Sequence, residues 1–515
     1  MKRFHRYLWL TVAIGVTAAC SSCEKKIPPE SCTQVSRPAE ISPDYSGIVV
    51  PPNVAPLNFR ILETGESFFV RISSSHGSPV EIYSRNANIE IPLGQWKSLL
   101  SENKGDKLSF VVFVFDSANG WRRYEPIFND IACEPIDSFL VFRFIRPIYN
   151  YWTSIRIYQR NIENYKNSLV LEGHFSDVGC INCHSFCNNS SETMSIATRN
   201  TNRSYNTSLV VHGGTLNKVP GTWGYAAWHP SGKLAVYSMN KVRQLFHATG
   251  VELRDVVDLD SGIACYRLDE KVEKIISELS GKDRLETYPA WSPDGTYLYY
   301  CSAPILWEDR DKTPPDNYDH VQYDLMRISY DVDKDQWGKP EIVLSTIETG
   351  MSILLPRISP DGRFLVFVMC DYSCFPAYRP SSDLYIMDLK TRSYQKLDAA
   401  NSPYSESWHS WSSNGRWLAF SSKRTGGFFT RTYFTHINEN GKASKPFILP
   451  QKDPTYYDSL LQTYSVPELI TQPVAVSPRR FGKTACSGSR DAVNLPVTGA
   501  TPTAQSSEPY QQGGK

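Results

Sequence analysis

One ten-residue pattern recurs four times between residues 227 and 420. The copies span residues 227–237, 290–300, 357–367 and 410–420, and their consensus reads W-S-P-D-G-x-x-Φ-x-Φ, with Φ apolar. Each repeat of this kind is one supersecondary unit that must stack on its neighbours to bury its apolar face. Four matches to one pattern therefore favour a repeat architecture over unrelated hairpins.

The pattern predicts a hairpin for a physical reason. Pro presets φ at the turn, Asp or Asn accepts backbone hydrogen bonds, and Gly takes positive φ so that the chain can reverse. The alternating run after each turn is then a strand with one buried face. The glycines Gly232, Gly295, Gly362 and Gly415 are 63, 67 and 53 residues apart. These intervals exceed the roughly 40–50 residues of a typical propeller blade, so long loops or degenerate blades are expected between the copies.

The pentapeptide Cys180-Ile181-Asn182-Cys183-His184 reads CxxCH, the attachment signature of a c-type haem. Two thiols at this spacing can each add to one vinyl group of the porphyrin, and the imidazole that follows can bind the iron. The alternatives are a CxxC redox pair, half of a zinc site, or two structural cysteines. We predict one covalent haem c, attached through Cys180 and Cys183, with His184 as an iron ligand.

The residue on the other side of the haem would decide its chemistry. Met194 is the nearest thioether and the expected second iron ligand, which would raise the potential and suit electron transfer; packing in a core is the alternative. Arg199 and Arg203 could bind the haem propionates or lie in solvent. An open sixth position would instead permit small-ligand or peroxide chemistry. Three histidines are rival ligands: His174, His212 and His247.

The beginning of the chain has the pattern of an export signal. Three basic residues precede an apolar run over residues 7–19, which is shorter than the about 20 residues of a membrane span. The run ends in Thr-Ala-Ala-Cys, which resembles a lipobox, so Cys20 is the expected lipidation site and Cys23 a weaker candidate. We expect an outer-membrane lipoprotein of the cell envelope, held on the membrane by its lipid anchor. Ordinary secretion is the alternative.

The pattern of the chain predicts six segments and a mainly β fold. Residues 1–19 are a signal peptide and residues 20–45, rich in Pro, Ser and charge, a tether. Residues 46–134 alternate like the short strands of a β-sandwich module. Residues 135–220 have a less regular apolar pattern and are expected to be a connector with one helix that carries the haem motif. The last two segments are a β-propeller over residues 221–475 and a disordered tail over residues 476–515.

Composition excludes some classes of function. The chain has 515 residues with 54 Lys and Arg against 53 Asp and Glu, a net charge of +1, and no basic block interleaved with aromatic residues, so a nucleic-acid partner is not expected. No nucleophile elbow, P-loop or HExxH motif is present. His409 lies between two tryptophans of a repeat, where packing or hydrogen bonding is the expected role.

The repeats resemble those of TolB-like (WD-type) β-propellers. With the lipobox and the CxxCH motif, the chain is similar over residues 48–470 to a family of TolB-like lipoproteins that carry one c-type haem motif; residues 407–411 and 445–451 match phrases typical of that family. The resemblance implies the fold and haem attachment, but no reaction, because propellers host many functions. The expected function is single-electron transfer, with protein partners on the propeller or the β module. An envelope scaffold, assembly or sensor protein with a structural haem, and a peroxidase-like enzyme, are the alternatives.

Overall fold

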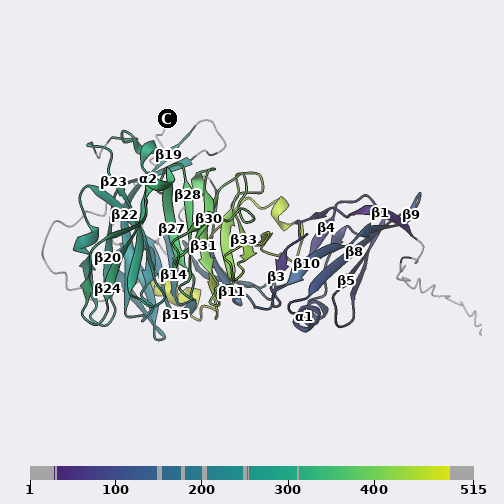
Figure 1. The fold of residues 1–515 in the computed structure, drawn as a ribbon. Helices are drawn as coiled ribbons and strands as arrows, with labels where there is room; N and C mark the ends of the chain where they lie inside the picture. Colours follow the sequence, from purple (N-terminus) through teal and green to yellow (C-terminus); the bar gives the residue numbers. More distant parts are fainter. Residues whose placement is uncertain are drawn as a thin grey trace, which may run out of the picture.

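A computed structural model describes residues 28, 32–147, 154–174, 180–199, 206–247, 252, 254–309 and 312–487. The chain forms two mainly β bodies, a ring of sheets and a smaller N-terminal module, which lie side by side (Figure 1). The predicted signal peptide, the lipidation candidates Cys20 and Cys23, and Arg203 lie outside the described residues.

Six antiparallel sheets in the described part of the chain form the blades of a β-propeller. We number them blade 1 to blade 6 and give the strands of each from the axis outward. Blade 1 contains β35 (Thr463–Ile470), β11 (Phe139–Ile145), β12 (Arg156–Asn161) and β13 (Asn167–Glu172). Blade 2 contains β14 (Cys180–Cys187), β15 (Ser190–Arg199), β16 (Asn206–His212) and β17 (Thr215–Pro220). Blade 3 contains β18 (Gly224–Trp228), β19 (Leu234–Phe246), β20 (Arg254–Arg267) and β21 (Val272–Ile275).

The other three blades follow in chain order. Blade 4 contains β22 (Arg284–Trp291), β23 (Tyr297–Pro304) and β24 (Asp324–Asp331), with β25 (Gln336–Trp337) and β26 (Glu341–Leu344) both paired to β24. Blade 5 contains β27 (Ser352–Ile358), β28 (Phe364–Cys370), β29 (Asp383–Asp388) and β30 (Tyr394–Lys396). Blade 6 contains β31 (Glu406–Trp411), β32 (Trp417–Ser422), β33 (Arg431–His436) and β34 (Phe447–Ile448). Short helical segments lie in the connections: η2 (Ser277–Leu279), η3 (Tyr318–His320), α2 (Thr346–Thr349), η4 (Pro376–Tyr378) and η5 (Tyr456–Asp458).

The ring closes because its first and last strands belong to one sheet. The innermost strands contact one another in the cyclic order β14, β18, β22, β27, β31 and β35, and β35 in turn contacts β14. Strand β35 pairs antiparallel with β11, with Leu140 opposite Leu469 and Phe144 opposite Tyr464. The end of the propeller sequence thereby supplies the inner strand of blade 1, whose other strands come from the beginning.

The four repeated turns connect the inner and second strands of blades 3 to 6, and the predicted hairpins are confirmed. In blade 4, the Ser292 hydroxyl donates to Asp294 and accepts the Tyr297 N–H at 3.0 Å. The Gly295 N–H donates to the Ser292 carbonyl at 2.9 Å. All four repeat glycines have φ between 67° and 74°, the left-handed region where a side chain is strained. Local chemistry alone therefore sets these reversals.

Two sheets and one helix form the N-terminal module. A seven-stranded sheet contains β1 (Thr33–Pro38), β9 (Gly120–Glu125), β8 (Lys107–Asp116), β10 (Ile127–Ile131), β3 (Val49–Val50), β5 (Ser67–Ser73) and β6 (Val80–Ser84). A three-stranded sheet contains β2 (Ile41–Ser42), β4 (Phe59–Ile61) and β7 (Asn88–Ile89), and the helix is α1 (Leu93–Glu102). Phe59, Trp96 and Phe110 are buried together in the core between them.

The module begins earlier than the sequence predicts. Residues 33–38 and 41–42, expected to belong to the tether, form β1 and β2. Strand β1 pairs in parallel with β9 through its backbone, while its side chains are almost all exposed. A strand of this kind has no apolar alternation, which explains why composition alone indicated a tether.

The module packs on blade 6 of the propeller (Figure 1). The Asn58 side chain donates to the Lys452 carbonyl at 2.8 Å, and the buried Trp417 indole N–H donates to the Glu134 carbonyl at 3.1 Å. Asp137 accepts hydrogen bonds from both the backbone and the hydroxyl of Ser413. One continuous apolar core runs through both bodies, so the module is fixed to the ring.

Two segments differ from the sequence prediction. Residues 135–220, expected to be a connector with one helix, contain strands β11 to β17 in blades 1 and 2. Blade strands are covered on both faces, so their apolar residues run together instead of alternating. Residues 478–486, expected in the disordered tail, form helix α3 (Pro478–Cys486), which Ser477 caps and whose Phe481 is fully buried.

No helix among the described residues is both long and apolar enough to span a membrane.

Candidate functional site in the axial channel

Each innermost strand contains one β-bulge, and the six bulges meet on the axis. In every innermost strand one residue has a left-handed backbone, and the pairing register shifts beside it. These residues are Cys183, Tyr225, Tyr288, Leu355, Trp408 and Val466, with φ of 52°, 46°, 55°, 54°, 44° and 51°. A non-glycine residue in this region costs about 1–3 kcal/mol. Repetition of that cost in six blades indicates that the ring uses the bulges to place side chains.

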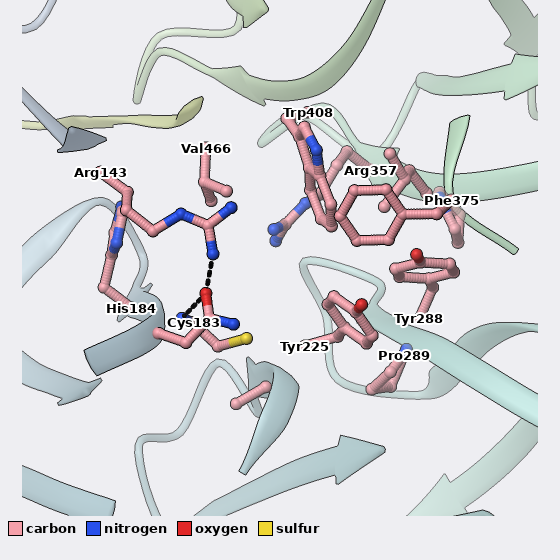
Figure 2. Close-up of a pocket in the computed structure, with 14 residues that line it drawn as sticks. Arg143, Cys183, His184, Tyr225, Tyr288, Pro289, Arg357, Phe375, Trp408 and Val466 are labelled. Atoms are coloured by element: carbon pink, nitrogen blue, oxygen red, sulfur yellow. Dashed lines mark hydrogen bonds between the residues drawn. The ribbon is translucent and has the colours of Figure 1, made fainter. Parts of the chain in front are cut away.

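All six bulge residues border one cavity of about 60 Å³, which we call the axial cavity. Tyr225 is 4.4 Å from Tyr288 and 5.6 Å from Trp408 between ring centroids, and Phe375 is 5.3 Å from Trp408. Figure 2 shows these aromatic rings on one side of the cavity, with Arg143 and His184 on the other. Aromatic side chains therefore form one side of the cavity wall.

The CxxCH motif lies on β14 and supplies the bulge of blade 2. Asn182 pairs with Ala197 and His184 pairs with Ile196, which leaves Cys183 as the extra residue. The Cys183 sulfur points toward Tyr225 in Figure 2. The motif thus occupies the position that tyrosine, leucine, tryptophan or valine occupies in the other blades.

A second cavity adjoins the first on the side of blades 2 and 3. This side cavity has a volume of about 180 Å³ and is bordered by Cys180, Cys183 and Arg199. Both thiols therefore open onto one space, while Cys183 and His184 open onto the axial cavity. Five residues border both cavities and separate them: Arg143, Asn182, Cys183, Tyr225 and Phe375.

His184 is buried, and within the described residues neither ring nitrogen makes a hydrogen bond of good geometry, although backbone groups of Val466 and Val141 interact weakly with the imidazole. Burial, and then the charge of Arg143, lower the pKa of His184 to about 3, although backbone groups of Val466 and Val141 act against this fall. The imidazole is therefore neutral at physiological pH. Two unpaired nitrogens in a buried site have a desolvation cost, and a neutral imidazole with a free nitrogen is a common metal ligand.

His409 occupies the equivalent place in blade 6 and provides a contrast. It also follows the bulge residue of its strand, and burial lowers its pKa to about 3. Its Nε2 donates to the Val366 carbonyl at 3.0 Å. The hydrogen-bonding role predicted for His409, which lies in strand β31, is confirmed. His184 has no such role.

The environment of the Cys180 thiol argues against the alternative of a CxxC redox pair. Burial raises the pKa of Cys180 to about 12, against the opposing charges of Arg199 and Arg143. Redox-active CxxC pairs need a lowered thiol pKa, because the thiolate is the nucleophile. In the part of the chain that the structure describes, no group of three or more His, Cys, Asp or Glu side chains could hold a metal ion. The zinc alternative therefore lacks the remaining ligands.

The donor set at the motif fits a haem c, whereas the free space is small. Two thiols border one cavity, and an imidazole with unpaired nitrogens lies next to them. Cofactor sites typically have about 300–1,000 Å³, more than the approximately 60 and 180 Å³ of the two cavities. A porphyrin would need the separating side chains, Arg143 and Phe375 among them, to move so that the cavities merge.

Of the other described residues predicted to contact the haem, one borders the side cavity and the rest border neither cavity. Arg199 lies directly opposite Cys180 in the β14–β15 pairing and borders the side cavity. Met194 is fully buried among apolar side chains of blades 1 and 2 and borders neither cavity. The rival histidines His174, His212 and His247 are exposed and border neither cavity.

The sequence analysis did not identify the aromatic residues that border the axial cavity, although their spacing within the inner strands could have indicated them. Each bulge residue stands three positions before an apolar residue at or next to the end of its inner strand, as Tyr288 stands before Trp291 and Trp408 before Trp411. Cys183 has the same relation to Phe186. When the six inner strands are aligned by this spacing, Cys183 of the CxxCH motif falls at the same position as the other five bulge residues.

The solved structures similar to this chain contain β-propellers. TolB from Acinetobacter baumannii is 13% identical with a TM-score of 0.41, over 71% of this chain and 79% of that one. Hydrazine synthase from Kuenenia stuttgartiensis is 10% identical with a TM-score of 0.41, over 66% of this chain and 48% of that one. The β-propeller domain of the Trilobed protease from Pyrococcus furiosus is 12% identical with a TM-score of 0.33, over 70% of this chain and 96% of that one.

The likeness stops at the fold. No protein-family model matches the chain, and no curated protein matches it. At these identities and TM-scores, none of the similar structures bears on what this chain does. The propeller assignment follows from the cyclic order of the blades and from their closure by β35.

Proposed function

We propose that this chain is an exported, membrane-anchored β-propeller that carries one haem c in its axial channel and transfers single electrons. Cys180 and Cys183 are the attachment sites, His184 is an iron ligand, and Cys20 carries the lipid. The observation that supports this proposal most strongly is the pair of unpaired nitrogens on the buried His184, next to two thiols that share a cavity. Protein partners would dock on the propeller or the N-terminal module.

The channel side chains have defined tasks in this proposal. A bound haem c would supply one-electron redox chemistry. Burial, and then the charge of Arg143, keep His184 neutral by lowering its pKa, so that a ring lone pair is available. Asn182 accepts a hydrogen bond from Arg143 and holds that guanidinium beside the motif. The rings of Tyr225, Trp408 and their neighbours exclude water and keep the local dielectric constant low.

Covalent attachment is tested by replacing the thiols. The full-length precursor is expressed in a bacterium with haem c maturation machinery, and the purified protein is examined by haem staining after denaturation and by its pyridine haemochrome spectrum. We expect about one c-type haem per wild-type chain and none in the Cys180→Ala/Cys183→Ala variant, because thioether bonds alone survive denaturation.

The matched control is Cys265→Ala/Cys301→Ala, which removes two thiols buried in blades 3 and 4. This variant should retain the full haem stain. A wild-type protein without covalent haem, or a motif variant that keeps it, would exclude the proposal.

A second candidate function is a haem site that binds small ligands, as a peroxidase-like enzyme requires. Neither Met194 nor the three rival histidines border the cavities at the motif, which favours an iron with an open sixth position. Carbon monoxide added to the reduced protein should then bind rapidly and shift the Soret band. Slow or absent binding would instead support a six-coordinate electron-transfer site.

A further inference from the structure

Two buried cations share one aromatic ring beside the channel. Arg254 and Lys423 are 5% and 6% exposed. The Arg254 guanidinium lies 4.2 Å from the ring centroid of Tyr378, and the Lys423 ammonium lies 5.1 Å from the same centroid. All three border a further cavity, which shares Arg143 and Phe375 with both cavities at the CxxCH motif. We call it the cationic cavity.

The positive charge around the cationic cavity is not balanced. Lys423 pairs with Glu252. Among the residues that the structure describes, Arg254 donates to two neutral acceptors, the Pro147 carbonyl and the Gln244 side chain, the latter at 3.4 Å. Arg143 likewise donates to the side chains of Asn182 and Ser465, both neutral. Within the described residues, no carboxylate forms an ion pair with Arg254 or Arg143.

The neighbouring carboxylate does not supply the missing charge. Asp255 is fully buried on the next position of β20, but it accepts from the Tyr372 hydroxyl at 2.9 Å and pairs with Arg379 at 3.7 Å. Taking a cation out of water costs several kcal/mol unless an anion or a full set of hydrogen bonds compensates it. Three cations with one carboxylate between them, around a cavity of about 30 Å³, therefore indicate a place for one small anionic group.

We propose that Arg254 and Lys423, on either side of Tyr378, form a carboxylate-binding site. The carboxylates come from one of two sources, the propionates of the haem or a free small carboxylate. The guanidinium offers a planar pair of donors that matches a carboxylate, and the ammonium adds a point charge.

The haem is the source that we favour, and this part rests on the proposed function. In a haem c the propionates are on the edge opposite the thioether bonds. Arg199, directly opposite Cys180 in the sheet, would then lie near the thioether bonds and away from the propionates. Tyr378 and Gln244 border the same side cavity as the two thiols, and both contact Arg254. Arg254 thereby takes the role that the sequence suggested for Arg199.

The experiment measures binding of succinate to the exported protein by calorimetry, with and without attached haem. The haem-free form is the full-length Cys180→Ala/Cys183→Ala variant. This variant should bind succinate. Adding Arg254→Gln or Lys423→Met should raise the Kd by about tenfold or more, as expected for loss of one charge-assisted hydrogen bond. Arg363→Gln, which removes an exposed arginine of blade 5, is the control and should leave the Kd unchanged.

The form with attached haem distinguishes the two sources. If the propionates occupy the site, the haem-loaded wild type does not bind succinate. If the ligand is a free carboxylate, the haem-loaded wild type binds it with the same dependence on Arg254 and Lys423. Haem staining of the same samples shows separately whether haem is attached, so failure of the proposed function is recognised independently. Absence of succinate binding to the haem-free form, or binding that both substitutions leave unchanged, would overturn the carboxylate site.

Discussion

Ending the chain after Gln462 should abolish the cooperative unfolding transition of the propeller. This truncation removes β35, the innermost strand of blade 1 and the contact between blades 6 and 2. It also removes Tyr464, Leu469 and Ile470, each at most 1% exposed. Burial of a large apolar side chain contributes about 1.5–3 kcal/mol. The three together approach the roughly 5–15 kcal/mol by which a typical domain is stable.

The matched truncation ends the chain after Ser487. It keeps β35 and helix α3, so its urea unfolding curve, followed by tryptophan fluorescence and circular dichroism, should match that of the full-length protein. The chain ending at Gln462 should give a broad, non-sigmoidal curve. If that shorter chain unfolded cooperatively at the wild-type urea concentration, the ring would not depend on closure by β35.

Replacing His184 by Ala should change the absorption spectrum of the haem-loaded protein, whereas replacing His409 by Ala should not. The two histidines occupy equivalent positions after the bulge residue, in blades 2 and 6, and both are almost fully buried. Removal of either leaves a cavity of similar size. Only His184 has ring nitrogens without partners next to the motif thiols. The spectrum therefore separates iron ligation from packing.

The two substitutions should affect the free energy of unfolding in the opposite order, with the larger loss for His409→Ala. His409→Ala leaves the Val366 carbonyl buried without its donor, at a cost of about 1–3 kcal/mol, while His184→Ala breaks no hydrogen bond within the described chain. Added imidazole should restore the Soret band of His184→Ala, since it can occupy the vacated position. An unchanged spectrum in His184→Ala, with haem still attached, would show that this imidazole does not bind the iron.

What the amino-acid sequence determined was local chemistry. Ser-Pro-Asp-Gly fixes a reversal through contacts within about five residues, so the hairpins of blades 3 to 6 could be predicted. The CxxCH motif and the absence of other catalytic motifs were equally visible. Helix α3 had a signal as well, since Ser477 and Pro478 form a typical helix start, but the polar composition around it suggested disorder.

Which distant strands share a sheet became visible only in the folded ring. Blade 1 pairs β11 with β35, and Arg143 donates to Ser465, 322 residues later, at 3.3 Å. No local pattern encodes such a pairing, because strands covered on both faces lose the alternation that marks a strand and its register. The same closure brings Cys183 onto the axis with aromatic residues of three other blades. The sequence thus shows the CxxCH motif, and the ring determines that it borders the axial cavity.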